Sequence, residues 1–260
     1  MTPAHLAAIQ TRLTERNTRR PRDRPTRDDC QDHHQMIVYE VAAKLPEIEV
    51  PRNRCRALAV LECVIDGGEP YYTYTREWGA DEAALMRNGS GDERAVVFTA
   101  EGAFIRLFDH ESTMTPYRAP DRELWPELLD GMPVVFGAHV EEPAFGDEDG
   151  QFLATAVLWR LRSDDRWQAG AGISFPPPRG LYDSGPDGSG MLEILLDDIV
   201  DRYVAFAEDY YEIQVDRNAV EHIVTRRPLT DPIVRALNPE ATLADLRADI
   251  ATIGYPLVAQ

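Results

Sequence analysis

The hydrophobic pattern changes its period near Pro176, and this change limits the fold more than any other feature of the chain. Between residues 57 and 170, short apolar runs alternate with turn residues, which is typical of strands. Between residues 190 and 253, apolar residues recur every three or four positions, which indicates amphipathic helices. We therefore predict an α+β protein in which a mainly antiparallel sheet has helices before and after it.

Six apolar runs predict a sheet of about five or six strands. They are residues 57–65, 71–75, 94–99, 103–108, 152–161 and 166–168. Ala100, Glu101 and Gly102 separate two of these runs and predict a hairpin, with Gly102 in a left-handed conformation. Acidic residues at its start and Gly131 at its end predict that a helix over residues 121–130 interrupts the sheet region.

The remaining patterned segments predict helices. Residues 4–18 and 29–45 precede the sheet, and Pro46 ends the second of these helices. One apolar stripe from Leu192 to Tyr210 predicts a single continuous helix. Three further helices are predicted to begin at Asp216, at Asp231-Pro232, and at the capping box of Thr242 and Asp245.

An Arg- and Pro-rich segment, residues 19–27, follows the first predicted helix and is not expected to form a regular element. We therefore divide the chain into residues 1–28, a helix and an arm, and residues 29–260, a single α+β domain. Within that domain we expect a sheet region over 57–175 and a helical region over 189–256. The arginines of the arm either dock on an acidic surface or belong to a solvated linker; they are Arg19, Arg20, Arg22 and Arg24.

The charge of the chain excludes several classes of partner. The 27 basic residues face 45 acidic ones, which gives a formal net charge of −18. Nucleic acids and anionic membrane surfaces both attract Lys and Arg, so this charge repels them. The first ten residues do not resemble a signal peptide, and three cysteines without a C-x-x-C pair do not indicate a disulfide framework. We expect a cytoplasmic protein with reduced thiols.

A polar segment at the end of one predicted strand is the candidate for chemistry. Asp109, His110 and Glu111 follow the apolar residues 103–108, and their side chains can bind a divalent metal or act as an acid–base pair if the chain bends there. No known metal motif has this spacing, and no cofactor is evident. The alternative is a capped strand end with His110 at the surface. A functional His110 should lie in a pocket beside Tyr117 or Trp125.

An acidic segment, residues 183–216, is the candidate for binding. It contains ten acids against one base, Arg202. On a continuous helix, five of these acids would form one stripe opposite the apolar face; they are Glu193, Asp197, Asp201, Glu208 and Glu212. Like charges on a helix repel each other. A basic partner would therefore reduce the repulsion between the acids of this stripe. The alternative is a solvated helix face.

Several short segments, taken in order, resemble those of a group of bacterial proteins of unknown activity. They are Phe-Asp-His-Glu-Ser at 108–112 with Pro116-Tyr117, Glu-Asp-Tyr-Tyr-Glu at 208–212, Arg-Pro-Leu-Thr at 227–230 and Leu-Asn-Pro at 237–239. The resemblance spans residues 94–256 and implies no functional residue.

Three functional hypotheses follow. The preferred one is a protein-binding protein, of the immunity or antitoxin kind, that associates with a basic protein through its acidic helix. The second is a metal-assisted hydrolase that uses Asp109, His110 and Glu111. The third is a structural or assembly subunit that associates with its own copies through the Arg-rich arm.

Overall fold

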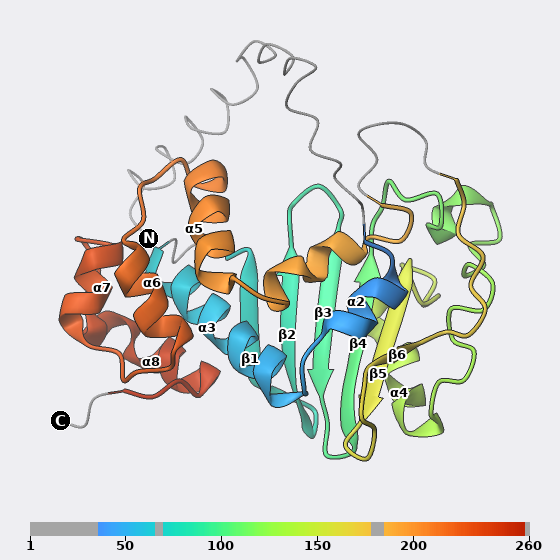
Figure 1. Ribbon diagram of the computed structural model, residues 1–260, viewed down its shortest axis with the longest axis horizontal. Helices are drawn as coiled ribbons and strands as arrows, with labels where there is room; N and C mark the ends of the chain where they lie inside the picture. The colour runs from blue at the N-terminus through green and yellow to red at the C-terminus, as the bar shows by residue number, and fades with distance from the viewer. Residues whose placement is uncertain (1–35, 66–69, 178–184, 258–260) are drawn as a thin grey trace, which may run out of the picture. The chain divides into compact units, whose positions relative to one another are not determined.

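The structure is a computed structural model and describes residues 36–65, 70–177 and 185–257, which belong to the compact unit Gln35–Gln260. Within this unit the α+β prediction is confirmed, because a six-stranded antiparallel sheet has helices before and after it (Figure 1). The predicted helix over 4–18, the arm at 19–27 and the boundary at residue 28 lie outside the described residues.

The sheet is a simple meander in which each strand pairs with the next one along the chain. Its strands are β1 (Tyr72–Trp78), β2 (Asp81–Arg87), β3 (Glu93–Phe98), β4 (Gly102–Phe108), β5 (Ala156–Leu161) and β6 (Gln168–Ala169). Every residue of β4 is buried, which places this strand at the centre of the molecule. Long loops and short helical turns join β4 to β5.

Helices cover one face of the sheet, and the β4–β5 connection covers the other. The helices are α2 (Val38–Lys44), α3 (Glu49–Ile65), α5 (Ile199–Tyr210), α6 (Arg217–Val224), α7 (Asp231–Leu237) and α8 (Leu243–Ile253). The β4–β5 connection holds the 3-10 turns η1 (Pro116–Arg118), η2 (Val134–Phe136) and η3 (Pro143–Phe145), and the short helix α4 (Gly137–Val140). A further 3-10 helix, η4 (Ser189–Leu195), precedes α5.

The two faces of the sheet have separate apolar cores. The larger core joins the helices to side chains such as Val96, Ile105 and Leu158. The smaller one joins Phe104 and Trp159 to buried aromatic residues of the β4–β5 connection. This two-sided burial explains why β3, β4 and β5 read as continuous apolar runs in the sequence.

The strand predicted over residues 57–65 is wrong, because these residues form the second half of α3. Side chains on several sides of α3 are buried, among them Ala57, Leu58 and Leu61. A short segment that is apolar on all sides does not show the helical period, so the pattern was ambiguous. The sixth strand is instead β2, which the sequence did not predict.

The helix predicted over residues 121–130 is also wrong, since this segment consists of turns. Pro126 lies in its middle and removes a helical hydrogen bond. Arg122 and Glu127 adopt left-handed backbone conformations, with φ of 53° and 66°. The segment is held by Leu128, which is buried in the larger core.

The continuous helix predicted from Leu192 to Tyr210 is broken between η4 and α5. Asp198 has a φ of 45°, which no α-helix allows. Arg54 of α3 donates to the carbonyl oxygen of Leu195, at 2.6 Å, and to that of Leu196. The guanidinium therefore takes up carbonyl groups that the next helical turn would otherwise use.

The predicted hairpin between β3 and β4 is present, but Gly102 is required for a different reason. Its φ is not in the left-handed region. A Cβ atom at this position would lie 2.1 Å from the carbonyl oxygen of Arg160 on β5. Glycine is therefore needed because the neighbouring backbone is close.

The helical C-terminal region is confirmed, because residues 190–253 form helices and contain no strand. Asp216 accepts from the backbone N–H groups of Asn218 and Ala219, and Thr242 accepts from that of Asp245. The sequence places the N-cap of α7 at Asp231, one residue too late, because Thr230 is the N-cap and Asp231 is the first residue of the helix. No helix in the described ranges is both long and apolar enough to cross a lipid bilayer.

Candidate functional site

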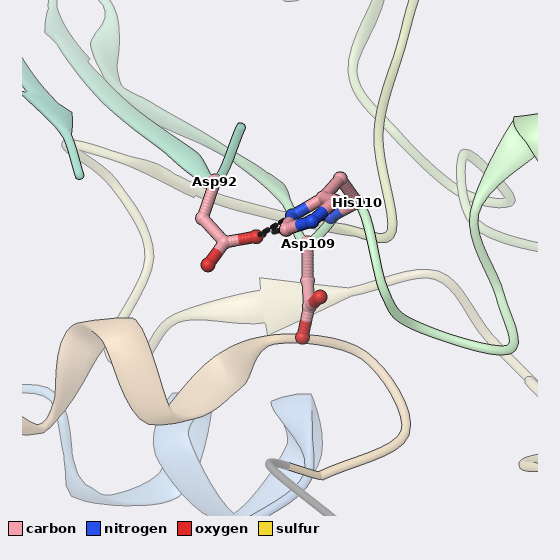
Figure 2. A group of neighbouring side chains, drawn as sticks. All are labelled: Asp92, Asp109 and His110. Atoms are coloured by element: carbon pink, nitrogen blue, oxygen red, sulfur yellow. Dashed lines mark hydrogen bonds and ion pairs between the residues drawn. The ribbon is translucent and has the colours of Figure 1, made fainter. Parts of the chain in front are cut away.

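The polar segment after β4 lies beside the start of β3. Glu93 pairs with Phe108 in the antiparallel ladder, so Asp92, which precedes β3, is brought next to Asp109 and His110 (Figure 2). Asp92 was not singled out in the sequence. The signal that could have found it is the turn Asn88-Gly89-Ser90-Gly91, which leads into the predicted strand and fixes the register of the hairpin.

Asp92 binds both the backbone and the ring of His110. Its Oδ1 atom lies 2.8 Å from His110 Nδ1 and accepts from the His110 backbone N–H at 3.1 Å. Asn88 donates to the other oxygen of Asp92 at 2.6 Å. The hydrogen bond from the His110 ring to Asp92 is the main reason why the pKa of His110 lies above its ordinary value. Gly91, with a φ of 115°, leaves room for the imidazole ring.

Asp109 and Glu111 lie next to this pair. Asp109 is buried, and its Oδ1 atom accepts from the backbone N–H groups of Glu111 and Ser112 at 2.9 and 3.0 Å. Figure 2 shows its carboxylate pointing away from the contact between Asp92 and His110. The side chain of Glu111 is 81% exposed, and its carboxylate lies 3.9 Å from His110 Nε2. The grouped donor atoms are therefore those of Asp92, Asp109 and His110, and Glu111 is an exposed neighbour of His110 outside this group.

Buried hydrogen bonds connect this turn to the segment before η4. The Ser112 hydroxyl donates to the carbonyl oxygen of Pro186 at 2.5 Å. Thr155 Oγ1 accepts from the Asp109 backbone N–H and lies 2.9 Å from the carbonyl oxygen of Asp187. The Asp187 carboxylate in turn accepts from the first N–H of α2, that of Val38, at 2.8 Å.

These bonds make a structural junction. Burial raises the pKa of Asp187, and the backbone donors from Ser189 and Val38 oppose that shift. The junction joins the ends of β4 and β5 to the start of α2, which is the role of a capped strand end.

One arrangement in the described residues has the donor types of a metal site. Ligand atoms of Asp92, Asp109 and His110 all lie within 4.8 Å of one another. One imidazole and two carboxylates suit a divalent cation such as Zn²⁺ or Mn²⁺. Asp92 and Asp109 each have an oxygen bound to backbone N–H groups, however, and Glu111, which the sequence suggested as a ligand, is not in the group.

The aromatic residues expected beside His110 have other contacts. Tyr117 packs edge-on against Phe108, with ring centroids 5.9 Å apart, and Arg122 lies over its ring. Trp125 donates from its indole N–H to the carbonyl oxygen of Ser174. These residues stabilise the β4–β5 connection.

The five acids of the predicted stripe do not lie on one helix. Glu193 is in η4, Asp197 lies between η4 and α5, and Glu212 follows α5. Arg202 forms salt bridges with both Glu193 and Asp197, at 3.2 and 3.3 Å, and offsets one of their two charges.

Asp201 forms a salt bridge of 2.7 Å with Arg217, which lowers the pKa of Asp201. Three of the five acids therefore have basic partners within the same compact unit. Glu208 lies in the last turn of α5, and Glu212 lies two residues after the end of that helix.

The C-terminal end of α5 combines exposed acids with half-buried aromatic rings. We call this region the α5-end surface; it consists of Tyr71, Phe206, Glu208, Asp209, Tyr210, Tyr211 and Glu212. The ring of Tyr71 lies 4.8 Å from Phe206 and 5.1 Å from Tyr210, measured between centroids. Phe206 stacks on Tyr210, with an angle of 16° between their planes. All three acids are exposed, and Glu208 and Asp209 have no salt bridge with any described residue.

A buried carboxylate fixes these rings in place. Glu62 of α3 accepts from the hydroxyl groups of Tyr203 and Tyr211, at 2.8 and 2.6 Å. It also accepts from the backbone N–H groups of Tyr71 and Tyr72. Burial raises the pKa of Glu62, while these hydrogen bonds oppose that shift. One carboxylate thus ties β1 to α5 beneath the α5-end surface.

Comparisons with known proteins do not assign this chain. No protein-family model matches it, and neither does any curated protein or solved structure at a significant level. Its function is therefore argued from its own residues.

Proposed function

We propose that this chain is a protein-binding protein that recognises a basic partner through the α5-end surface. The observation that carries the proposal is the aromatic cluster with exposed acids at its edge. Tyr is enriched at binding hot spots, because it offers a large contact area with few rotatable bonds. The ring of Tyr71 can receive a guanidinium by a cation–π contact, while Glu208 and Asp209 bind its N–H groups.

The charge of the surrounding unit supports a basic partner. The first 35 residues contain seven of the 27 basic residues and five of the 45 acids. Residues 36–260 therefore contain 20 basic and 40 acidic residues, a formal charge of −20. A field of this sign speeds the approach of a cationic protein, and the contacts at the α5-end surface would then determine where it binds.

The test must separate the site from the overall charge. The site variant combines Glu208→Gln, Asp209→Asn and Glu212→Gln. The control variant combines Glu77→Gln, Asp165→Asn and Glu240→Gln, which are exposed acids outside the α5-end surface. Both variants lose three charges and change two glutamates and one aspartate.

The probe is a fluorescein-labelled nona-arginine peptide, measured by fluorescence anisotropy at about 50 mM salt. The site variant should bind it at least tenfold more weakly than the control variant. Wild-type protein should prefer nona-arginine over nona-lysine, because a guanidinium stacks on aromatic rings better than an ammonium does. Equal affinities of the two variants would contradict the proposal.

A metal-assisted hydrolase is the second candidate, and the grouped donor atoms of Asp92, Asp109 and His110 favour it. Purified protein incubated with Zn²⁺ or Mn²⁺ and passed over a desalting column would retain about one equivalent of metal under this hypothesis. The Asp92→Asn variant should then lose the metal. If wild-type protein retained no more metal than the Asp92→Asn variant, this function would be excluded.

The same site variant distinguishes the third hypothesis, assembly through the Arg-rich arm, from binding of a basic partner. If the α5-end acids hold that arm, neutralising them should speed proteolysis near residue 20 or reduce the particle size in light scattering. A change in nona-arginine binding without either effect would favour the basic partner.

A further inference from the structure

Two neighbouring valines are exposed in the turn η2. Only three large apolar side chains are exposed among the described residues, and two of them are Val134, at 93%, and Val135, at 52%. The turn itself is anchored, because Phe136 is fully buried and its ring lies 6.1 Å from that of Phe104 in the smaller core. The valines therefore stay at the surface in a fixed conformation, and we call them the Val134–Val135 patch.

The chain around this patch is acidic throughout. Residues 123–149 contain eight acids and no lysine or arginine. The acids are Glu123, Glu127, Asp130, Glu141, Glu142, Asp147, Glu148 and Asp149. His139 adds no positive charge at neutral pH, because burial lowers its pKa. Arg122, directly before this segment, forms salt bridges with Asp147 and Asp149, at 2.5 and 3.7 Å. The other six acids still leave the apolar patch in a strongly negative segment of the chain.

We propose that the Val134–Val135 patch is a second docking surface, which takes a basic partner protein through an apolar side chain flanked by Lys or Arg. Burial of the two valines would supply the apolar contact, and acids of this segment other than Asp147 and Asp149 would pair with the flanking cations. Charge complementarity favours a basic protein as the partner that binds this patch. A second copy of this chain would bring two acidic segments together, which like-charge repulsion disfavours.

This surface is separate from the α5-end surface. Figure 1 shows α4, which continues directly from η2, and α5 at opposite ends of the sheet. The patch also belongs to the sheet face that carries the smaller core. The inference therefore rests on its own observation and does not depend on the proposed function.

The test uses two labelled hexapeptides of equal charge. Both carry two arginines on each side of a central pair, which is Leu-Phe in one peptide and Ser-Ser in the other. Wild-type protein should bind the Leu-Phe peptide about tenfold more tightly, which corresponds to ~1.4 kcal/mol. The V134S/V135S variant should lose this preference, and it should remain folded because both side chains are exposed.

The site variant at the α5-end surface serves as the control, because it should keep the preference for the Leu-Phe peptide. Two results would overturn the proposal. One is equal binding of both peptides by wild-type protein, or a preference that V134S/V135S retains. The other is a wild-type dimer in light scattering that V134S/V135S converts to a monomer, since a second copy would then cover the patch.

Discussion

Replacing Glu62 by alanine should destabilise the protein strongly, and the structure gives the size of the effect. The carboxylate accepts four hydrogen bonds, from the hydroxyls of Tyr203 and Tyr211 and the backbone N–H groups of Tyr71 and Tyr72. The bonds from Tyr203 and Tyr72 are buried. Leaving a buried donor unpaired costs about 1–3 kcal/mol. Two such donors, with some rehydration of the others, give an expected loss of about 4 kcal/mol.

Urea unfolding followed by tryptophan fluorescence measures this change in the free energy of unfolding. A loss of about 4 kcal/mol is a large share of the 5–15 kcal/mol typical of a folded domain. Tyr211→Phe is the matched comparison. It removes one partly buried donor and leaves the carboxylate three others, so we expect a loss of about 1 kcal/mol. A Glu62→Ala variant within about 1 kcal/mol of wild type would refute the view that this carboxylate holds β1 and α5 together.

Three further predictions concern other parts of the fold. His110→Gln should lower stability more at pH 5.5 than at pH 8.5 in chemical denaturation. Asp92 raises the pKa of His110 in the folded state, so the stabilisation is present at low pH and is lost as the pH rises through that pKa; an equal loss at both pH values would contradict the Asp92 contact. Gly102→Ala should destabilise by at least 2 kcal/mol in urea unfolding, because its Cβ would overlap the carbonyl oxygen of Arg160; wild-type stability would show that β5 can move away. Asp216→Ala should cost about 1 kcal/mol, the usual worth of an N-cap, and no change in the urea midpoint would argue against that cap.

Local signals predicted the elements that depend on local physics. The helix caps at Asp216 and Thr242, the hairpin around Gly102 and the switch to helices after Pro176 were readable, because each depends on residues only a few positions apart. Pro126 should also have been decisive, since a proline in the middle of residues 121–130 is unfavourable in a helix.

The remaining features depend on contacts between distant residues. Residues 81–87 are Asp-Glu-Ala-Ala-Leu-Met-Arg, which favours a helix by propensity, yet pairing with β1 and β3 makes them a strand. The break before α5 depends on Arg54, about 140 residues away in the chain.

For the candidate site, the sequence identified His110 but not its partner Asp92. The contact between these two residues depends on the register of β3 and β4, which the sequence pattern does not show. It identified Glu208 and Glu212, but not the ring cluster that Tyr71, the residue before β1, completes. A pattern of charges alone does not distinguish Asp201, which pairs with Arg217, from Glu208, which has no such partner among the described residues.

Site-specific photo-crosslinking in living cells tests the central proposal most directly. Tyr210→p-benzoylphenylalanine keeps an aromatic ring at the α5-end surface and captures whatever protein touches it. The same substitution at Arg166, an exposed residue after β5, is the control. Mass spectrometry should identify a partner with an isoelectric point above about 9 from position 210 and not from position 166, in line with the basic charge that the surface selects. The same products at both positions, or adducts only to the chain itself, would contradict the proposal that the α5-end surface binds a basic partner.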